Sequence, residues 1–320
     1  MMKWEKLGKI FDPADHVLPS GCSCYAQSPQ ALVFADYIRV YFSTRSIDSD
    51  HNYLSHIAFA DFSKDFKEII HVSKSTVIPL GDLGTFDEHG IFPISPYKDG
   101  DIIVAYTCGW SRRVSVPVET SIGYVISNDG GLTFQRIGPG PILSCSPKEP
   151  VLVGDGFVKK FGNLYYMWYI FGKPWLEKSD NEPPARVYKI TFATSKDGLV
   201  WEKNDGHEII ESLIDDNECQ ALPTVIEAGD MYHMIFCYRY SSDFRTNVKR
   251  GYRLGYAYSK DLQTWTRDDK KLNLDISPSD WDSEMMCYPH LLEVDNTIYL
   301  LYNGNNFGKD GFGAAKLIQL

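Results

Sequence analysis

The chain repeats one pattern five times, and this repeat constrains the fold more than any other feature of the sequence. The landmarks of the five units are Pro29, Pro93, Gly156, Pro223 and Pro289, separated by 64, 63, 67 and 66 residues. One unit of about 65 residues therefore fills the chain of 320 residues. A repeat of this length indicates a modular architecture in which each unit forms one supersecondary element.

Each unit carries the same four strand-like segments in the same order. A short segment surrounds the landmark, and an aromatic, β-branched run such as IRVYFSTR or LYYMWYIFG follows it. This composition predicts a buried strand rather than a helix. A third segment ends in Ser-x-Asp, which predicts a tight turn, and an aromatic residue such as Trp201 then opens a fourth strand. The sequence therefore predicts an all-β fold, a five-bladed β-propeller with four-stranded antiparallel blades.

The two ends of the chain are expected to share a blade. The fifth unit stops at its third strand, FGAAKLIQL, and the missing fourth strand resembles residues 4–11, whose first letters WEK match residues 201–203. We expect the N-terminal strand to join the last blade and close the ring, because closure removes an exposed sheet edge. The expected single domain covers residues 1–320, with blades at approximately 20–80, 86–145, 150–212, 216–275 and 281–320 plus 4–11.

The composition predicts a soluble protein that binds neither nucleic acid nor membrane. The formal net charge is −10 and the isoelectric point is about 5.3, which makes polyanions poor general partners. No apolar run approaches the roughly 20 residues that span a bilayer, and the N-terminus lacks the apolar core of a signal peptide. The seven cysteines form no CxxC pair, and His89, His233 and His290, the histidines considered as metal ligands, lie in different units. We expect a cytoplasmic protein without metal or cofactor, and its oligomeric state stays open.

Strand direction predicts where a site would form. The first strand of each blade lies beside the central channel and the second returns antiparallel, so the starts of first strands and the ends of second strands share one face. Glu88, Glu218 and Glu284 each stand five residues before a landmark. We expect these carboxylates to converge at one end of the channel as catalytic groups. The alternative is that each one caps the loop between two blades.

Polar and aromatic side chains at the ends of the second strands are expected to surround the channel on the same face. Aromatic faces stack on sugar rings, while arginine and asparagine hydrogen-bond to hydroxyls or pair with anions. The arginines could instead only neutralise the glutamates. As a set, these side chains favour a small carbohydrate or sugar-phosphate ligand, and the local positive charge indicates an anionic group on it. The expected binding residues are Asp87, His89, Arg45, Trp110, Arg112, Lys173, Arg239, Asn303 and Asn305.

Three segments carry a family resemblance: VGDGFVKKFGNLYYMWY, NECQALPTVIEAGDMYHMIFCYR and SKDGLVWEK. They resemble the five-bladed propeller glycosidases of glycoside hydrolase families 43, 32 and 68 and the phosphorylase family 130. The resemblance implies that Asp155 occupies the position of a family aspartate, with Gly156 in place of proline. It also implies that Glu218, in a Glu-Cys pair like that of family 32, is the general acid.

One position departs from the resemblance. Ser28 stands where the first blade of the family carries its catalytic aspartate. A neutral serine cannot act as the second carboxylate that glycoside cleavage requires. Either another acid such as Asp87, Glu88 or Glu284 has taken this role, or the protein does not hydrolyse glycosides in the family manner.

Two functions follow from this sequence. The first is an enzyme that cleaves or transfers a glycosidic or glycosyl-phosphate bond, with bacterial polysaccharide metabolism as its expected setting. The second is a catalytically inactive propeller that binds a glycan or a sugar nucleotide.

Overall fold

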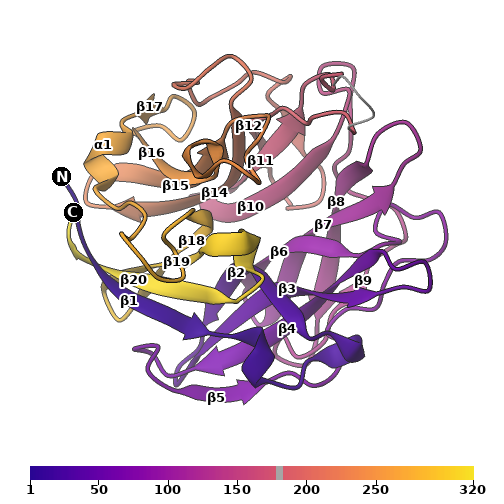
Figure 1. Ribbon diagram of the computed structural model, residues 1–320, viewed down its shortest axis with the longest axis horizontal. Helices are drawn as coiled ribbons and strands as arrows, with labels where there is room; N and C mark the ends of the chain where they lie inside the picture. Colours follow the sequence, from indigo (N-terminus) through magenta and orange to yellow (C-terminus); the bar gives the residue numbers. More distant parts are fainter. Residues whose placement is uncertain (178–182) are drawn as a thin grey trace.

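Five four-stranded antiparallel sheets surround a central axis in the computed structural model, which describes residues 1–177 and 183–320 (Figure 1). The arrangement is a five-bladed β-propeller, so the predicted fold class is confirmed. Within the described residues the helical elements are short: α1 (Asp269–Leu272), η1 (Pro13–Asp15), η2 (Pro19–Gly21), η3 (Val248–Arg250) and η4 (Asn305–Gly308). None of them is long and apolar enough to cross a membrane.

Four sheets each take their strands from one sequence repeat, and the fifth adds the N-terminal strand; within each sheet the strand order runs from the channel outward. Blade I contains β2 (Cys24–Val33), β3 (Ile38–Ile47), β4 (Tyr53–Phe62) and β5 (Ile69–Val72). Blade II contains β6 (Ile91–Asp99), β7 (Ile102–Arg112), β8 (Val118–Ser127) and β9 (Gln135–Arg136). Blade III contains β10 (Val153–Phe161), β11 (Leu164–Gly172), β12 (Tyr188–Ser195) and β13 (Glu202–Lys203). Blade IV contains β14 (Cys219–Ala228), β15 (Met231–Arg239), β16 (Arg253–Ser259) and β17 (Thr266–Arg267). Blade V contains β18 (Cys287–Val294), β19 (Thr297–Asn303), β20 (Phe312–Gln319) and β1 (Lys3–Phe11).

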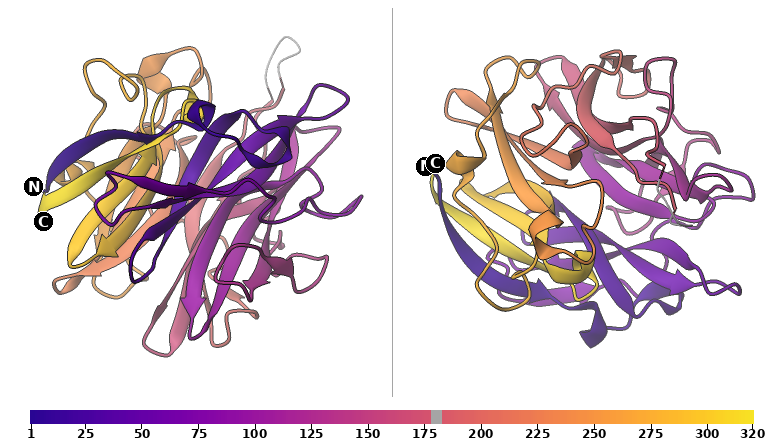
Figure 2. Two further views of the ribbon diagram at one scale, coloured as in Figure 1. Left: turned by 90° about the horizontal axis from the view of Figure 1, so that it is seen from below. Right: turned by 45° about the horizontal axis from the view of Figure 1, so that its top comes forward.

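The N-terminal strand closes the ring, as the WEK match predicts. Strand β1 pairs antiparallel with β20, with Phe11 opposite Phe312. Both views in Figure 2 show the two chain ends side by side at the edge of this blade. Phe11 is buried and its ring stacks on that of Phe312, with the centroids 5.2 Å apart. Closure therefore adds core packing to the hydrogen-bonded ladder.

Each repeat landmark is the second residue of a β-bulge. In all five first strands the register shifts at the landmark, so that one extra residue enters the strand there. A bulge residue has no ladder partner, so proline, which has no N–H to donate, is tolerated at this point. The residue before the landmark adopts positive φ at Ser28, Asp155, Leu222 and Tyr288. The repeat seen in the sequence thus marks a bend in the strand nearest the channel.

The Ser-x-Asp motif forms the expected turn between third and fourth strands. Ser195 Oγ donates to Asp197 Oδ1, which also accepts the backbone N–H groups of Leu199 and Val200 at 2.9 Å. The indole of Trp201 donates to Gly198 O. The same pattern recurs at Ser259 and Asp261, so each motif fixes the aromatic residue that opens the next strand.

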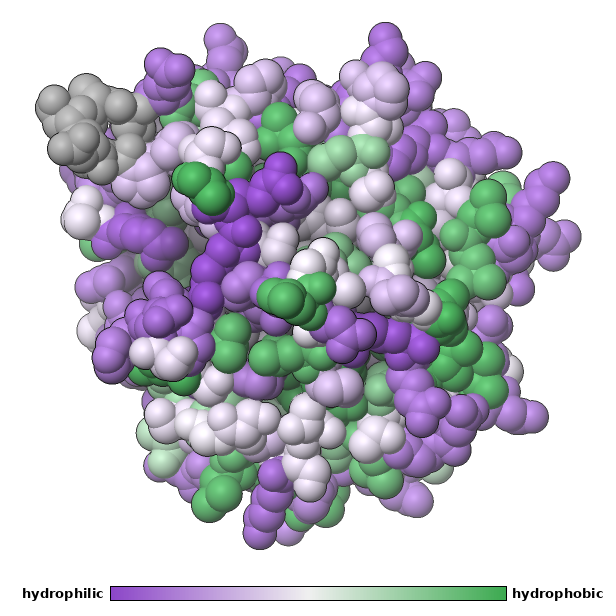
Figure 3. All heavy atoms as spheres, turned by 90° about the vertical axis from the view of Figure 1, so that its right-hand side faces the viewer, coloured by the Kyte–Doolittle hydropathy of each residue, from purple (hydrophilic) through white to green (hydrophobic). Residues whose placement is uncertain are grey.

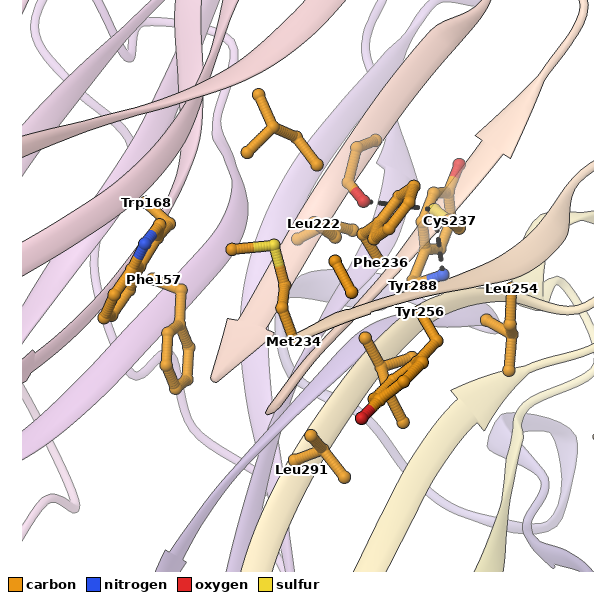
Figure 4. Close-up of a cluster of buried hydrophobic side chains, with 14 of the residues drawn as sticks. Phe157, Trp168, Leu222, Met234, Phe236, Cys237, Leu254, Tyr256, Tyr288 and Leu291 are labelled. Atoms are coloured by element: carbon orange, nitrogen blue, oxygen red, sulfur yellow. Dashed lines mark hydrogen bonds between the residues drawn. The ribbon is translucent and has the colours of Figure 1, made fainter. Parts of the chain in front are cut away.

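Apolar side chains between the blades form the core. Figure 4 shows Trp168 and Phe157 of blade III facing Met234 of blade IV and Leu291 of blade V. Trp168 and Met234 have no exposed surface. The outer surface differs from this core: on the face drawn in Figure 3 hydrophilic residues predominate, and apolar side chains are scattered among them. Burial between neighbouring blades therefore stabilises the ring.

Candidate functional site

A cavity of about 300 Å³ opens at the end of the channel where first strands begin and second strands end. All five first strands contribute to its wall, as the strand directions predict. Their contributions are Gln27 from β2, Phe92 from β6, Asp155 from β10, Ala221 from β14 and Tyr288 from β18. The cavity is large enough for a small ligand such as a monosaccharide.

The bulges present one equivalent residue of each blade at this end of the channel. These residues are Ser28, Phe92, Asp155, Leu222 and Tyr288. Asp155 is the acidic member of this set, and it is also the sole carboxylate among the described residues that line the cavity. Four of the five hold positive φ, between 48° and 55°, which costs L-residues free energy and is common at functional sites.

The glycines on both sides of Asp155 let the backbone pack closely against neighbouring side chains. A Cβ atom at Gly154 would lie 2.7 Å from Cys108 Sγ, and one at Gly156 would lie 2.9 Å from Ile122 Cδ1. Glycine is therefore required at both positions unless these neighbours move. This explains why the third repeat has glycine where the other four have proline.

The Asp155 carboxyl group has a shifted proton affinity. Burial raises the pKa of Asp155 to about 7, against the smaller lowering effects of the Leu222 N–H and the Arg186 guanidinium. A carboxyl group with this pKa can donate a proton near neutral pH. Asp155 is thus equipped for acid catalysis in the cavity.

Guanidinium groups give the cavity a positive potential. Arg45, Arg186, Arg239 and Arg245 all line it, and Asp155 is the one carboxyl group that opposes them among the described lining residues. Arginine suits the recognition of carboxylate and phosphate groups because its planar fork donates several hydrogen bonds. The wall therefore favours a ligand that carries negative charge.

Aromatic side chains make up half of the remaining lining residues. Phe244 and Phe307 meet edge to face, with centroids 6.0 Å apart, and Tyr188 and Tyr252 share a hydroxyl–hydroxyl hydrogen bond of 2.6 Å. Burial raises the pKa of Tyr188, which keeps its hydroxyl neutral. The cavity thus combines ring faces with neutral hydrogen-bonding groups, the surfaces on which sugars stack and bind.

Four of the residues predicted for the site line the cavity: Asp155, Arg45, Trp110 and Arg239. The three glutamates do not. Glu218 is fully buried and pairs with Arg267 at 2.6 Å instead of lining the cavity. Its general-acid role stays a prediction, and one that would require it to leave Arg267.

The other predicted carboxylates also have partners outside the cavity. Glu88 Oε2 accepts the Gly84 N–H, and Asp87 forms a buried ion pair with Arg136. Glu284 is exposed beside the loop that Asn305 holds. These positions match the alternative of loop capping. Their catalytic or binding roles stay predictions.

Five predicted binding residues make structural contacts instead of lining the cavity. Arg112 pairs with Asp48, and its backbone N–H meets the ring of His89. Lys173 pairs with Glu208. Asn303 is fully buried and bridges Ser28 N, Ala26 O and Gly311 O, while Asn305 holds Glu284 N and Asp280 O.

Sequence reasoning missed several cavity residues. Arg245 and Phe244 lie in the long loop between β15 and β16, where no repeat pattern marks them. Tyr288 could have been found, because it is the residue before a landmark, like Asp155. Further missed members with polar or aromatic side chains include Gln27, Tyr25, Phe92, Arg186, Tyr188, Tyr252 and Phe307.

In the described ranges 1–177 and 183–320, no group of three or more His, Cys, Asp or Glu side chains could hold a metal ion. The fold and the cavity instead define a class: a five-bladed β-propeller with one buried acid and several arginines at one end of its channel.

Solved structures share this fold. The chain matches a structure described as a glycoside hydrolase with a TM-score of 0.72 and 16% identity, over 97% of this chain and 90% of the other. It matches a thermostable family-43 glycoside hydrolase with a TM-score of 0.63 and 13% identity, over 91% and 88%. A third match comes from work on GH130 mannoside phosphorylases and glycoside hydrolases that target β-1,2 mannosidic linkages in Candida mannan, with a TM-score of 0.68 and 14% identity over 98% and 93%. The resemblance of the fold to the propeller glycosidases is confirmed.

Relatives by sequence define the family more narrowly. No family model matches the chain. Two proteins of Mycobacterium tuberculosis, "Uncharacterized protein MT1551" of strain CDC 1551 / Oshkosh and "Uncharacterized protein Rv1502" of strain ATCC 25618 / H37Rv, are each 32% identical to it over 321 aligned positions, covering 99% of both chains. The chain belongs to the same family as these two proteins.

Proposed function

We propose that this protein is a carbohydrate-active enzyme that cleaves or transfers a glycosidic or glycosyl-phosphate bond, with Asp155 as proton donor. The observation that carries the proposal is the position of Asp155 in the cavity, buried and with a pKa of about 7. A general acid works best when its pKa lies near the working pH. The aromatic and arginine-rich wall supports a carbohydrate ligand.

The single acid also indicates which nucleophile attacks. Hydrolysis with two carboxylates needs a second acidic group as base or nucleophile. The described cavity wall offers Asp155 alone, and Ser28 and Tyr288 occupy equivalent bulge positions without a carboxylate. A nucleophile that is already anionic, such as phosphate, needs no base. The geometry therefore favours phosphorolysis or the reverse transfer over hydrolysis.

Activity toward a panel of glycosides tests this function. Release of the aglycone is measured with and without inorganic phosphate for wild type and Asp155→Asn, and glycosyl phosphates are assayed in the reverse direction. We expect phosphate-dependent turnover that falls about 100- to 10,000-fold in the variant. Full activity of Asp155→Asn would exclude the acid role, and turnover that is independent of phosphate would exclude the proposed nucleophile.

The second candidate is a propeller that binds a glycan or sugar nucleotide without turnover. It is favoured by the same bulge positions, because four of the five carry no acid: they hold serine, phenylalanine, leucine and tyrosine. Saturable binding of one sugar without turnover across the panel would establish this function in place of the enzyme.

A further inference from the structure

Three arginines of the cavity lack an anionic partner within the described residues. Arg239 is 2% exposed, and its guanidinium donates to Tyr240 O at 2.7 Å and to the Tyr188 hydroxyl at 2.8 Å. Its Nε atom has no hydrogen-bond partner. A buried cation without a counter-ion is costly, since burial removes its hydration. A ligand that supplies negative charge would offset this cost.

Arg45, on blade I, also lacks an anionic partner among the described residues. Its guanidinium lies over the rings of Tyr25 and Tyr53, 4.8 and 5.2 Å from their centroids, and its buried Nε also lacks a partner. Burial, together with the neighbouring charge of Arg245, lowers the pKa of Arg45 against the raising effects of nearby tyrosines. Two cations that repel each other in one cavity are the expected signature of an anion site.

Arg245 completes the set from the loop between β15 and β16. It lies over Phe244 at 5.1 Å and over Phe307 at 4.8 Å, while Arg239 lies over Phe244 at 3.7 Å. The rings orient the guanidinium planes without using their hydrogen-bond donors. The donors of Arg245, and those of Arg239 that Tyr240 O and the Tyr188 hydroxyl leave free, therefore stay available to a bound oxyanion.

Arg45 and Arg245 lie away from the acid in the ring, whereas Arg239 ends β15 of the neighbouring blade IV. Arg45 belongs to blade I, and Arg245 contacts Phe307 in the connection of blade V. Asp155 lies on β10 of blade III, which packs between β6 and β14. Strands β18 and β2 pack against each other on the other side of the channel. An anionic group held by Arg45 and Arg245 is thus separate from the atom that Asp155 would protonate.

Gln27 presents to the cavity a hydrogen-bond acceptor that has no donor among the described residues. Its Nε2 group donates to Phe307 O at 2.5 Å, and its Oε1 atom is buried at the cavity wall without a donor. A free oxyanion cannot satisfy this acceptor, whereas a sugar hydroxyl can. The cavity wall therefore favours a ligand that carries both hydroxyl groups and negative charge.

We infer that the ligand of this cavity is an acidic sugar, one that carries a phosphoryl or carboxylate substituent held by Arg45, Arg239 and Arg245 while its hydroxyls reach Gln27 and Asp155. Charge balance favours the phosphoryl group, because three guanidinium groups exceed the charge of one carboxylate. The inference rests on the proposed function only in placing a carbohydrate in this cavity.

Calorimetric titration of the purified protein at fixed ionic strength tests the inference. The probes are hexose 1-phosphates, hexose 6-phosphates, hexuronic acids, the matching neutral hexoses and inorganic phosphate. We expect at least one acidic sugar to bind about 10- to 100-fold more tightly than its neutral counterpart, the range of one or two charge-assisted hydrogen bonds. It should also bind more tightly than inorganic phosphate.

Variants assign the effect to the arginines. Arg245→Gln should weaken the acidic sugar about 10-fold or more and leave the neutral hexose unchanged. Arg113→Gln is the matched control, because Arg113 is exposed, pairs with Glu119 and lies outside the cavity wall. Thermal unfolding checks that both variants fold.

Three outcomes would overturn the inference: equal affinity for acidic and neutral sugars, equal affinity for inorganic phosphate and the best sugar phosphate, or no effect of Arg245→Gln. The proposed function fails separately. Tight binding of an acidic sugar without any turnover supports the inference and contradicts the enzyme. Turnover of neutral glycosides, with no preference for acidic ones, supports the enzyme and contradicts the inference.

Discussion

Arg267 donates to Glu218 Oε1 at 2.6 Å, and neither side chain has exposed surface. Glu218 lies directly before β14, the innermost strand of blade IV, and Arg267 lies on β17, the outermost. The other carboxylate oxygen accepts the backbone N–H groups of Leu213 and Ile214. The ion pair therefore links the segment before the innermost strand of blade IV to its outermost strand. We call this contact a clamp.

The same clamp recurs in three other blades. An acid before the first strand pairs with the third residue of the fourth-strand motif that reads FQR, WEK or WTR. The acids are at most 1% exposed, so all four pairs are buried on the acidic side. The further pairs are Asp87 with Arg136, Glu149 with Lys203, and Asp282 with Lys6.

Glu218→Gln is therefore expected to lower stability. The amide removes one of the two carboxylates that pair with Arg267, which keeps its contact with Asp269 at 2.8 Å. The expected cost therefore lies below the roughly 3–5 kcal/mol of a buried charge left without any partner. Chemical denaturation measures the change in the free energy of unfolding. Glu284→Gln is the control, since Glu284 is exposed and its side chain forms no ion pair among the described residues. Wild-type stability of Glu218→Gln together with lost turnover would instead establish Glu218 as the general acid.

The clamps show why the acids were predicted as a catalytic set. Their spacing from the landmark is visible in the sequence, and so is the motif of the fourth strand. What the sequence does not display is that these two segments meet across the blade, about 50 residues apart, as in Glu218 and Arg267. An acidic residue that recurs at the same position in several blades can indicate a structural contact as readily as a catalytic site.

The propeller architecture can be predicted from the sequence because it depends on the repeat period and on the strand pattern within each repeat. Bulge prolines, aromatic strands and Ser-x-Asp turns recur in nearly every repeat, and the WEK match placed β1 beside β20. The cavity depends on the differences between repeats. Gly156 replaces proline beside Asp155, and Arg245 enters from the connection between β15 and β16, outside the repeated strand motifs. Such single deviations carry no periodic signal.

Asp155→Asn is expected to remove a pH dependence of stability. The pKa of Asp155 is raised from 3.8 to about 7 by burial, so the folded state binds its proton more tightly than the unfolded state. This contribution is fully present below pH 3.8 and is lost as the pH rises through about 7. Wild type should therefore lose about 1.4 kcal/mol per pH unit relative to the variant across this window. Denaturation at several pH values measures the difference, and parallel curves for the two proteins would exclude the shift.

Phe11→Ala is expected to loosen the closing strand. The Phe11 ring is 2% exposed and contacts Phe42 and Phe312, so truncation leaves a cavity that costs about 3–5 kcal/mol. Val114→Ala is the control, because Val114 is fully exposed in the loop after β7. Removing residues 1–11 should abolish cooperative unfolding, since it exposes the edge of β20. Cooperative unfolding of the truncated chain at wild-type temperature would show that closure is not required.

His290 is expected to make the protein sensitive to acid. Its Nε2 atom accepts the Ala31 N–H at 3.0 Å, which joins β18 to β2 across the boundary of blades V and I. Burial, with a smaller effect of Lys159, lowers the pKa of His290 from 6.5 to about 3. The neutral ring therefore stabilises the fold above pH 6.5, and this contribution is lost as the pH falls toward 3.

His290→Gln separates this effect from other titrations, because the amide oxygen can still accept the Ala31 N–H without binding a proton. The free energy of unfolding of wild type should fall relative to the variant by about 1.4 kcal/mol per pH unit below pH 6.5. His71→Gln, at an exposed position on β5, should leave the wild-type pH dependence unchanged. If His290→Gln follows the wild-type curve down to pH 4, the buried ring is not the group that responds to acid.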